Sequence, residues 1–103
     1  NSSRVLEIEC AGFKTIGGLL EMFIPAVLSN RPSAQESVFR KIIPSRYFKR
    51  HEYENGTGSC DELIERLSPY ERILSVTDFI SGMTDRYAVE LYQRLSGIKL
   101  PVY

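Results

Sequence analysis

The chain has 103 residues, of which 43% are hydrophobic and 25% charged, and its formal net charge is zero at pH 7. This composition argues against disorder, and the balanced charge excludes a strong overall attraction to nucleic acid or to a membrane surface. The longest apolar run, MFIPAVL, is far shorter than the roughly 20 residues of a membrane span, so we expect a cytoplasmic protein without a membrane partner. Cys10 and Cys60 are expected to be reduced thiols.

Residues 4–9 open the chain with a partial alternation of apolar and acidic residues, which allows either one short strand or a first helical turn. Beyond them an amphipathic helix is predicted, because apolar residues recur at steps of three and four: Phe13, Ile16, Leu20, Phe23, Ile24 and Val27. Gly17 and Gly18 indicate close approach of a neighbouring backbone. Pro25 is expected to kink this helix or to end it near Phe23.

A Ser-x-x-Glu capping box predicts the start of a second helix. Ser33 and Glu36 occupy the two positions of the box, and the helix is expected to run to about Ile43, where Pro44 ends it. Residues 45–58 mix charges of both signs with a Gly-rich tail. We expect a loop there, with one turn anchored by aromatic residues.

Two further capping signals follow. Ser59 is expected to open a short helix over 60–67, and Ser68 opens the next one, with Pro69 at its favoured first position. This second helix is expected to stop near Gly82. Its predicted buried stripe consists of Tyr70, Ile73, Leu74, Thr77 and Ile80.

A corner is predicted after that helix. Gly82 would let the chain turn, Met83 would be buried in the corner, and Thr84 would cap a last helix with Asp85 in its first turn, facing the positive end of the helix dipole. Gly97 is the expected stop of that helix. Its predicted buried face consists of Ala88, Leu91, Tyr92 and Leu95. The expected fold class is therefore all-α.

Catalytic chemistry is poorly represented in the chain. His51 is the single histidine, so a His/His-Asp/Asp metal site cannot be built from these residues alone. The segment ENGTGS lacks the lysine and the spacing of a P-loop. On residue patterns alone, the chain is an all-helical segment of a larger enzyme or binding domain.

A basic and aromatic cluster offers an alternative function. Such a cluster could bind single-stranded DNA or RNA, but the structural interpretation of an exposed helix end and loop is favoured, because nearby glutamates neutralise the charge. The cluster consists of Arg40, Lys41, Arg46, Lys49 and Arg50, interleaved with Phe39, Tyr47 and Phe48.

The charged residues near the corner, and Glu9, each allow two interpretations. Asp78, Asp85 and Arg86 fit a helix cap with a structural ion pair, or the wall of a polar pocket. Glu9 fits a solvated face, or a carboxylate that accepts two hydrogen bonds from the edge of a guanine.

Two stretches carry a resemblance to a known family. The segment YERILSVTDFISGMTDRYAVELYQRL (70–95) resembles the C-terminal signature of bacterial deoxyguanosine triphosphate triphosphohydrolases, in which an Asp-aromatic-Ile-(Ser/Ala)-Gly-Met-Thr-Asp core precedes a Tyr-Ala helix. The segment VLEIECAGFKTIGGLLEMF (5–23) is similar to an upstream block of the same family. The resemblance covers nearly the whole chain, and is loose over 30–60.

The resemblance implies a helical enzyme with the HD fold that hydrolyses dGTP, or another dNTP, to the deoxynucleoside and triphosphate. It implies a divalent metal, magnesium or manganese, held by His, His-Asp and Asp ligands. Those ligands are absent here, so residues 1–103 are interpreted as one segment, the C-terminal helical portion of the enzyme, incomplete for catalysis on its own. The implied partners are the remainder of the enzyme and further copies in a homo-oligomer, with single-stranded DNA as an additional candidate.

The resemblance also assigns site residues. Glu9 matches the acid at the guanine edge, and Val5 matches an apolar residue near the base. Arg40 is the nearest candidate for a basic residue that approaches the base from a neighbouring subunit. A structural role is implied for the signature residues Asp78, Gly82, Thr84, Asp85 and Arg86. No catalytic residue and no metal ligand is assigned within the chain.

Overall fold

The computed structural model describes the backbone of residues 2–49 and 59–99 and the side chains of residues 14–49 and 59–97. Throughout these ranges the regular secondary structure is helical, and no strand occurs in them. The predicted all-α fold class is therefore confirmed.

The first helix, α1, spans Ser2–Leu28 and includes residues 4–9, so the alternative of a short strand there was wrong. A strand at that position would need a neighbouring strand for its N–H and C=O groups, whereas a helix satisfies them internally. The expected break near Phe23 was also wrong, because α1 runs through Pro25. Proline removes one N–H donor, but the C=O of Pro25 still accepts from Ser29 N at 3.0 Å, and the apolar stripe continues through Ala26.

Capping boxes set the starts of the next helices, as predicted. Helix α2 spans Ala34–Ile42, and its N-cap Ser33 accepts from Glu36 N while the Glu36 carboxylate accepts from Ser33 N. A 3₁₀ turn, η1, spans Ser45–Phe48 within the segment predicted as a loop with an aromatic-anchored turn. Helix α3 spans Cys60–Glu65, so it begins at the predicted residue, with Ser59 accepting from Glu62 N at 3.3 Å, but ends two residues before the predicted 67.

The last two helices meet at the predicted corner. Helix α4 spans Pro69–Ser81 and helix α5 spans Asp85–Lys99. Helix α5 continues past Gly97, so the predicted stop at that glycine was wrong. A glycine within a helix lowers helix stability by about 1 kcal/mol relative to alanine. This loss is too small to end a helix where the chain does not turn.

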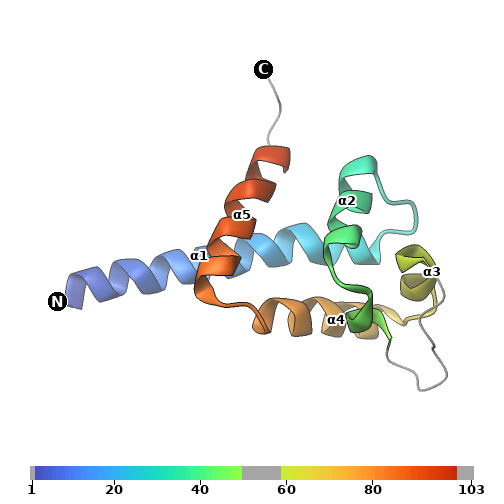
Figure 1. Ribbon diagram of the computed structural model, residues 1–103, viewed down its shortest axis with the longest axis horizontal. Helices are drawn as coiled ribbons and strands as arrows, with labels where there is room; N and C mark the ends of the chain where they lie inside the picture. Colours follow the sequence, from blue (N-terminus) through green and yellow to red (C-terminus); the bar gives the residue numbers. More distant parts are fainter. Residues whose placement is uncertain (1, 50–58, 100–103) are drawn as a thin grey trace.

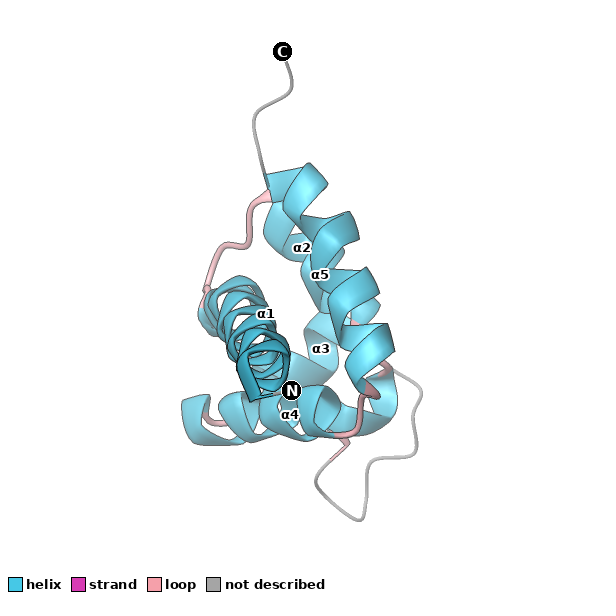
Figure 2. Ribbon diagram, turned by 90° about the vertical axis from the view of Figure 1, so that its left-hand side faces the viewer, coloured by secondary structure: helices cyan, strands magenta, loops and turns pink. Residues whose placement is uncertain are grey.

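Helix α1 is the axis of the fold. It packs against α4, α2 and α5, while η1 packs against α4 and α3. Figure 1 shows the N-terminal half of α1 extending beyond the other helices. Viewed along α1 in Figure 2, α4 lies beneath it and α5 and α2 lie on one side.

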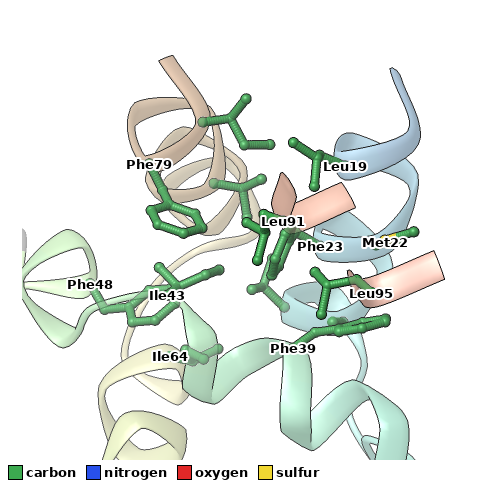
Figure 3. Packing of buried hydrophobic residues seen from close by; sticks show 14 of the residues in the cluster. Leu19, Met22, Phe23, Phe39, Ile43, Phe48, Ile64, Phe79, Leu91 and Leu95 are labelled. Carbon is green, nitrogen blue, oxygen red and sulfur yellow. The ribbon is translucent and has the colours of Figure 1, made fainter. Parts of the chain in front are cut away.

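The core lies where the five helices and η1 converge in the described part of the chain (Figure 3). Phe23 is at its centre, with ring centroids 5.7 Å from both Phe39 and Phe79. The fully or nearly fully buried hydrophobic residues are Leu19, Met22, Phe23, Ala26, Val27, Phe39, Ile43, Phe48, Leu63, Ile64, Leu67, Val76, Phe79, Ile80, Ala88, Leu91 and Leu95.

The buried stripe of α4 differs from the predicted one. Its buried residues are Ser75, Val76, Phe79 and Ile80, whereas Tyr70 is 70% exposed. Apolar residues occupy more than one side of this helix. Their spacing in the sequence therefore does not show which side packs against α1 and η1. The predicted face of α5 is confirmed at Ala88, Leu91 and Leu95, which are buried, whereas Tyr92 is half-buried against the core.

Candidate functional site

Glu9 and Val5 lie on the N-terminal part of α1, the part that extends beyond the other helices in Figure 1. Their side chains lie outside the described residues, so the role assigned to them in base recognition stays a prediction. What the structure adds is that both positions belong to a continuous helix that the core holds at its other end.

Arg40 is buried, with only 3% of its surface exposed. Its Nε donates to Ala26 O at 2.7 Å and its Nη2 to Ser29 O at 2.6 Å, and its Nη1 pairs with Asp61 Oδ1 at 2.9 Å. Asp61 is half exposed. The buried guanidinium therefore links the end of α1 to the first turn of α3.

Arg72 on α4 approaches the same end of α1. Its Nη1 donates to Val27 O at 3.1 Å and its Nε to Leu67 O at 3.1 Å. The last turn of α1 contains no basic residue of its own, and cations are favourable at a helix C-terminus. Two arginines from distant parts of the chain therefore supply donors to the terminal carbonyls of α1.

Between these arginines lies a polar cavity of about 310 Å³. Its lining consists of Ser29, Asn30, Pro32, Arg40, Asp61, Glu65 and Arg72. The carboxylates of Asp61 and Glu65 offset the positive charge. This mixed lining, with each guanidinium already bonded to backbone carbonyls, fits a helix-joining contact better than an anion site.

The structure does not bring Arg40 and Glu9 together within one chain. The Arg40 guanidinium is bonded to Ala26 O, and Ala26 follows Glu9 by 17 helical residues, about 25 Å along α1 at 1.5 Å per residue. A base held at Glu9 would therefore need Arg40 from a second copy, as the resemblance implies. The substrate role of Arg40 stays a prediction.

At the α4–α5 corner the predicted cap is present. Thr84 Oγ1 accepts from Tyr87 N at 3.1 Å, and Asp85 is the first residue of α5. Arg86 pairs with Glu90 one turn on, at 3.1 Å and well exposed. The main-chain carbonyl of Asp78 accepts from Gly82 N at 3.2 Å.

Gly82 differs from expectation in one respect. Its φ is −83° and its ψ is −4°, an ordinary right-handed conformation that any residue adopts. The corner therefore does not depend on the conformational freedom of glycine. Met83 is half-buried rather than fully buried, and it packs against the core.

A second hollow, about 410 Å³, opens at this corner. Its lining consists of Pro44, Arg46, Tyr47, Phe79, Gly82, Met83, Thr84 and Tyr87. The Arg46 guanidinium lies 4.7 Å from the centre of the Tyr47 ring, which in turn packs edge-on against Phe79 with a centroid separation of 5.6 Å.

The basic and aromatic cluster is not a free stacking surface. Phe39 and Phe48 are buried in the core, and Arg40 is buried at the end of α1. Lys41, Arg46 and Lys49 are exposed, and Arg50 lies outside the described residues. Stacking of bases on the two phenylalanines would require the core to open, so the structure gives no support to single-strand binding through them.

Sequence reasoning missed Arg72 and Tyr87. The bond from Arg72 to Val27 O joins residues 45 positions apart, and no local pattern reports such a partner. Tyr87 lies outside the predicted buried face of α5, and the structure shows it exposed beside the hollow at the corner. No spacing in the sequence indicates that position.

Metal and thiol chemistry are sparse in the described part of the chain. It contains no group of three or more His, Cys, Asp or Glu residues that could hold a metal ion. His51 lies outside the described residues.

Cys60 is a free thiol, and burial raises its pKa. The negative charge of Asp61 raises this pKa further, whereas the positive charges of Arg40 and Lys41 act to lower it. None of the helices in the described ranges is both long and apolar enough to cross a membrane.

Comparison with known proteins identifies relatives. The family model of the phosphohydrolase-associated domain matches residues 65–94, which include α4, the corner and most of α5. A deoxyguanosinetriphosphate triphosphohydrolase-like protein of Listeria monocytogenes is 40% identical over 91% of the chain. A protein of the same description from Synechocystis sp. is 34% identical over 93% of the chain.

A deoxyguanosinetriphosphate triphosphohydrolase of Klebsiella pneumoniae is 29% identical over 92% of the chain. The chain spans only about a fifth of the length of these relatives, with 20%, 19% and 22% of the respective proteins covered. No solved structure matches the chain significantly.

Proposed function

We propose that this chain, which is homologous to the C-terminal region of deoxyguanosinetriphosphate triphosphohydrolases, supplies the base-recognition helix and subunit contacts of such an enzyme. The reaction is hydrolysis of dGTP to deoxyguanosine and triphosphate. The observation that carries the proposal is the similarity over more than nine-tenths of the chain, at 40% identity to the Listeria protein.

The catalytic centre of the proposed enzyme lies in the part of the protein outside this segment. The described residues provide no set of donors for a metal ion, so they do not fit the magnesium or manganese site that the resemblance implies. No chemical step is therefore assigned to this chain. Its contribution is binding and orientation of the substrate.

Recognition of the base is assigned to Glu9. A carboxylate accepts hydrogen bonds from N1–H and from the exocyclic amine of guanine, whereas adenine presents an acceptor at N1 and lacks this pair of donors. A site built to pair with both donors rejects the analogue that lacks them, because buried polar groups would then lose their partners. Val5 precedes Glu9 by one helical turn, and we assign it an apolar contact with the base.

The continuous helix supports this assignment mechanically. Glu9 is carried by α1, whose C-terminal end is fixed by Arg40 and Arg72 and whose middle is buried at Leu19 and Phe23. A rigid helix holds a recognition group in place more accurately than a loop does. Contacts across a subunit interface would bring Arg40 of a second copy near the same base.

The reaction is tested on the complete polypeptide that contains this segment, called the parent protein below. Purified parent protein is incubated with dGTP and a divalent metal, and the products are separated by ion-exchange chromatography. The expected products are deoxyguanosine and inorganic triphosphate in equal amounts. Release of diphosphate or of single phosphate instead would show a different reaction and would contradict the proposal.

A further inference from the structure

Helix α5 crosses α1 at Gly18, between the half of α1 that is buried and the half that carries Glu9. Figure 1 shows α5 lying across α1, with the N-terminal half of α1 extending beyond the crossing. On the other side of the crossing, Leu19 and Phe23 are fully buried in the core. The crossing is therefore placed to determine the direction in which the N-terminal half of α1 leaves the core.

The ring of Tyr92 on α5 occupies the space in which Gly18 has no side chain. A Cβ atom on Gly18 would lie 2.8 Å from Tyr92 Cζ and 2.9 Å from Tyr92 Cδ1, whereas carbon atoms in contact are normally about 3.5–4.0 Å apart. Ala88 and Leu95, one turn before and after Tyr92, are buried on the same face of α5. A methyl group at Gly18 would therefore push the ring and α1 apart by about 1 Å.

The backbone of α1 is intrinsically weakest at this point. Gly17 and Gly18 are adjacent, glycine is a poor helix former, and glycine pairs are a common place for helices to kink. Helix α1 nevertheless continues through both residues. Contact with Tyr92 thus supports α1 where the helix itself resists bending least.

The second fixed point of α1 is its C-terminal end, where Arg72 donates to Val27 O. Glu9 lies twice as far from Val27 along the helix as Gly18 does. A tilt about this end that displaces α1 by about 1 Å at Gly18 therefore displaces Glu9 by about 2 Å. A recognition group must be held to within about 0.5 Å of its productive position, so a displacement of this size matters for binding of the base.

We propose that the contact between Tyr92 and Gly18 determines nucleotide specificity in the parent protein, with Tyr92 as a positioning residue that sets where α1 carries Glu9. The inference rests on the proposed function for the role of Glu9. Tyr92 acts through α1 and is not assigned a contact with the substrate. Selection of guanine then depends on α5 as well as on the helix that carries the carboxylate.

The test measures kcat/KM for dGTP and for dATP in the parent protein and in its variants Gly18→Ala and Tyr92→Ala. The matched control is Gly17→Ala, which makes the same chemical change at the adjacent residue of the same helix. An added Cβ at Gly17 meets none of the described residues within 4 Å. Thermal unfolding of each variant is measured alongside.

In Gly18→Ala the preference for dGTP over dATP is expected to fall about tenfold, because Glu9 no longer lies where both guanine donors reach it. The value for dATP should change little, since adenine lacks that pair of donors. Tyr92→Ala should lower the preference about threefold, because α1 loses a support but is not pushed aside. Gly17→Ala should leave it unchanged. A purely structural role would lower the values for both substrates equally.

A double variant, Gly18→Ala with Tyr92→Ala, tests whether the ring is the cause. Removal of the ring leaves room for the added methyl group, so Gly18→Ala should cause no further loss of preference when it is combined with Tyr92→Ala. An equal tenfold loss with and without the ring would overturn the inference. If Gly18→Ala alone does not fold, Tyr92→Ala decides, and an unchanged preference in that variant would overturn the inference as well.

Two further outcomes count against the inference. A preference that stays unchanged in folded Gly18→Ala would show that the position of α1 does not depend on this contact. A loss in Gly17→Ala equal to that in Gly18→Ala would assign the effect to helix stiffness instead of the ring.

Glu9→Gln separates this inference from the proposed function. A lower preference in Glu9→Gln together with an unchanged one in Gly18→Ala would overturn the inference and leave the proposed function standing. A parent protein that hydrolyses dGTP and dATP equally well would remove the assigned base recognition, and the inference with it.

Discussion

At the scale of single residues, the most informative side chain is Arg40. Composition and spacing place it in a basic cluster, and the resemblance makes it a candidate to reach a nucleotide base. The structure shows it buried, with donors to Ala26 O, Ser29 O and Asp61. These contacts join three segments of the chain. A role toward substrate in a second copy would use the face of the guanidinium that lines the polar cavity.

Replacing Arg40 by methionine is expected to destabilise the chain by about 3 kcal/mol, because the buried Ala26 carbonyl and the part-buried Ser29 carbonyl lose a charged donor. The control is Asp61→Asn, which removes the exposed partner of the same pair and should cost less than about 1 kcal/mol. Urea unfolding followed by circular dichroism measures both. Equal effects of the two substitutions would show that the ion pair, rather than the carbonyl contacts, stabilises the end of α1.

At the scale of secondary-structure elements, features set by residues within one helical turn could be predicted from the sequence. Features set by contacts between residues far apart in the chain could not. Ser33, Ser59 and Ser68 cap their helices as the Ser-x-x-Glu spacing predicts, because both partners lie within one turn. Pro25 was expected to kink its helix or end it, and Gly97 to end its helix, yet α1 and α5 continue past these residues.

The candidate site shows the same division. Thr84 was identified as a cap because Tyr87 N lies three residues away. The bonds of Arg40 and Arg72 to the end of α1 depend on how α1, α2 and α4 pack, and no periodicity in the sequence reports that geometry. The side of α4 that is buried could not be chosen either, because apolar residues surround much of that helix.

The contact between α1 and α5 explains one of two adjacent glycines. A Cβ atom on Gly18 would collide with the ring of Tyr92, whereas a Cβ atom on Gly17 would meet none of the described residues within 4 Å. The expected close approach of a neighbouring backbone was therefore wrong at Gly18, where the close neighbour is the side chain of Tyr92. Gly17 has no close neighbour among the described residues.

Opposite effects are therefore expected from the two alanine substitutions. Gly18→Ala should destabilise the chain by about 1–3 kcal/mol through overpacking against Tyr92. Gly17→Ala should stabilise it by up to about 1 kcal/mol through helix propensity. Thermal unfolding of both variants measures the difference, and a stabilised Gly18→Ala would mean that Tyr92 moves aside at no cost.

At the scale of the whole molecule, the fold is an open helical assembly. Its core anchors one end of a 27-residue helix, and Figure 1 shows the other end, which carries Glu9, reaching past the remaining helices. A projecting helix is suited to contribute a recognition group to a site formed with other parts of a protein. The chain is similar to about one fifth of the length of a deoxyguanosinetriphosphate triphosphohydrolase-like protein, which leaves most of such a protein outside this segment.

The central claim is that α1 supplies base recognition through Glu9. The decisive measurement compares kcat/KM for dGTP and dATP in the parent protein, in Glu9→Gln and in the matched control Glu7→Gln, whose position lies about 200° away around the helix. Glu9→Gln is expected to lower the preference for dGTP by about 10- to 100-fold, the loss of a charged hydrogen-bond pair, while Glu7→Gln leaves it unchanged. An unchanged preference in Glu9→Gln, or an equal loss in both variants, would contradict the account.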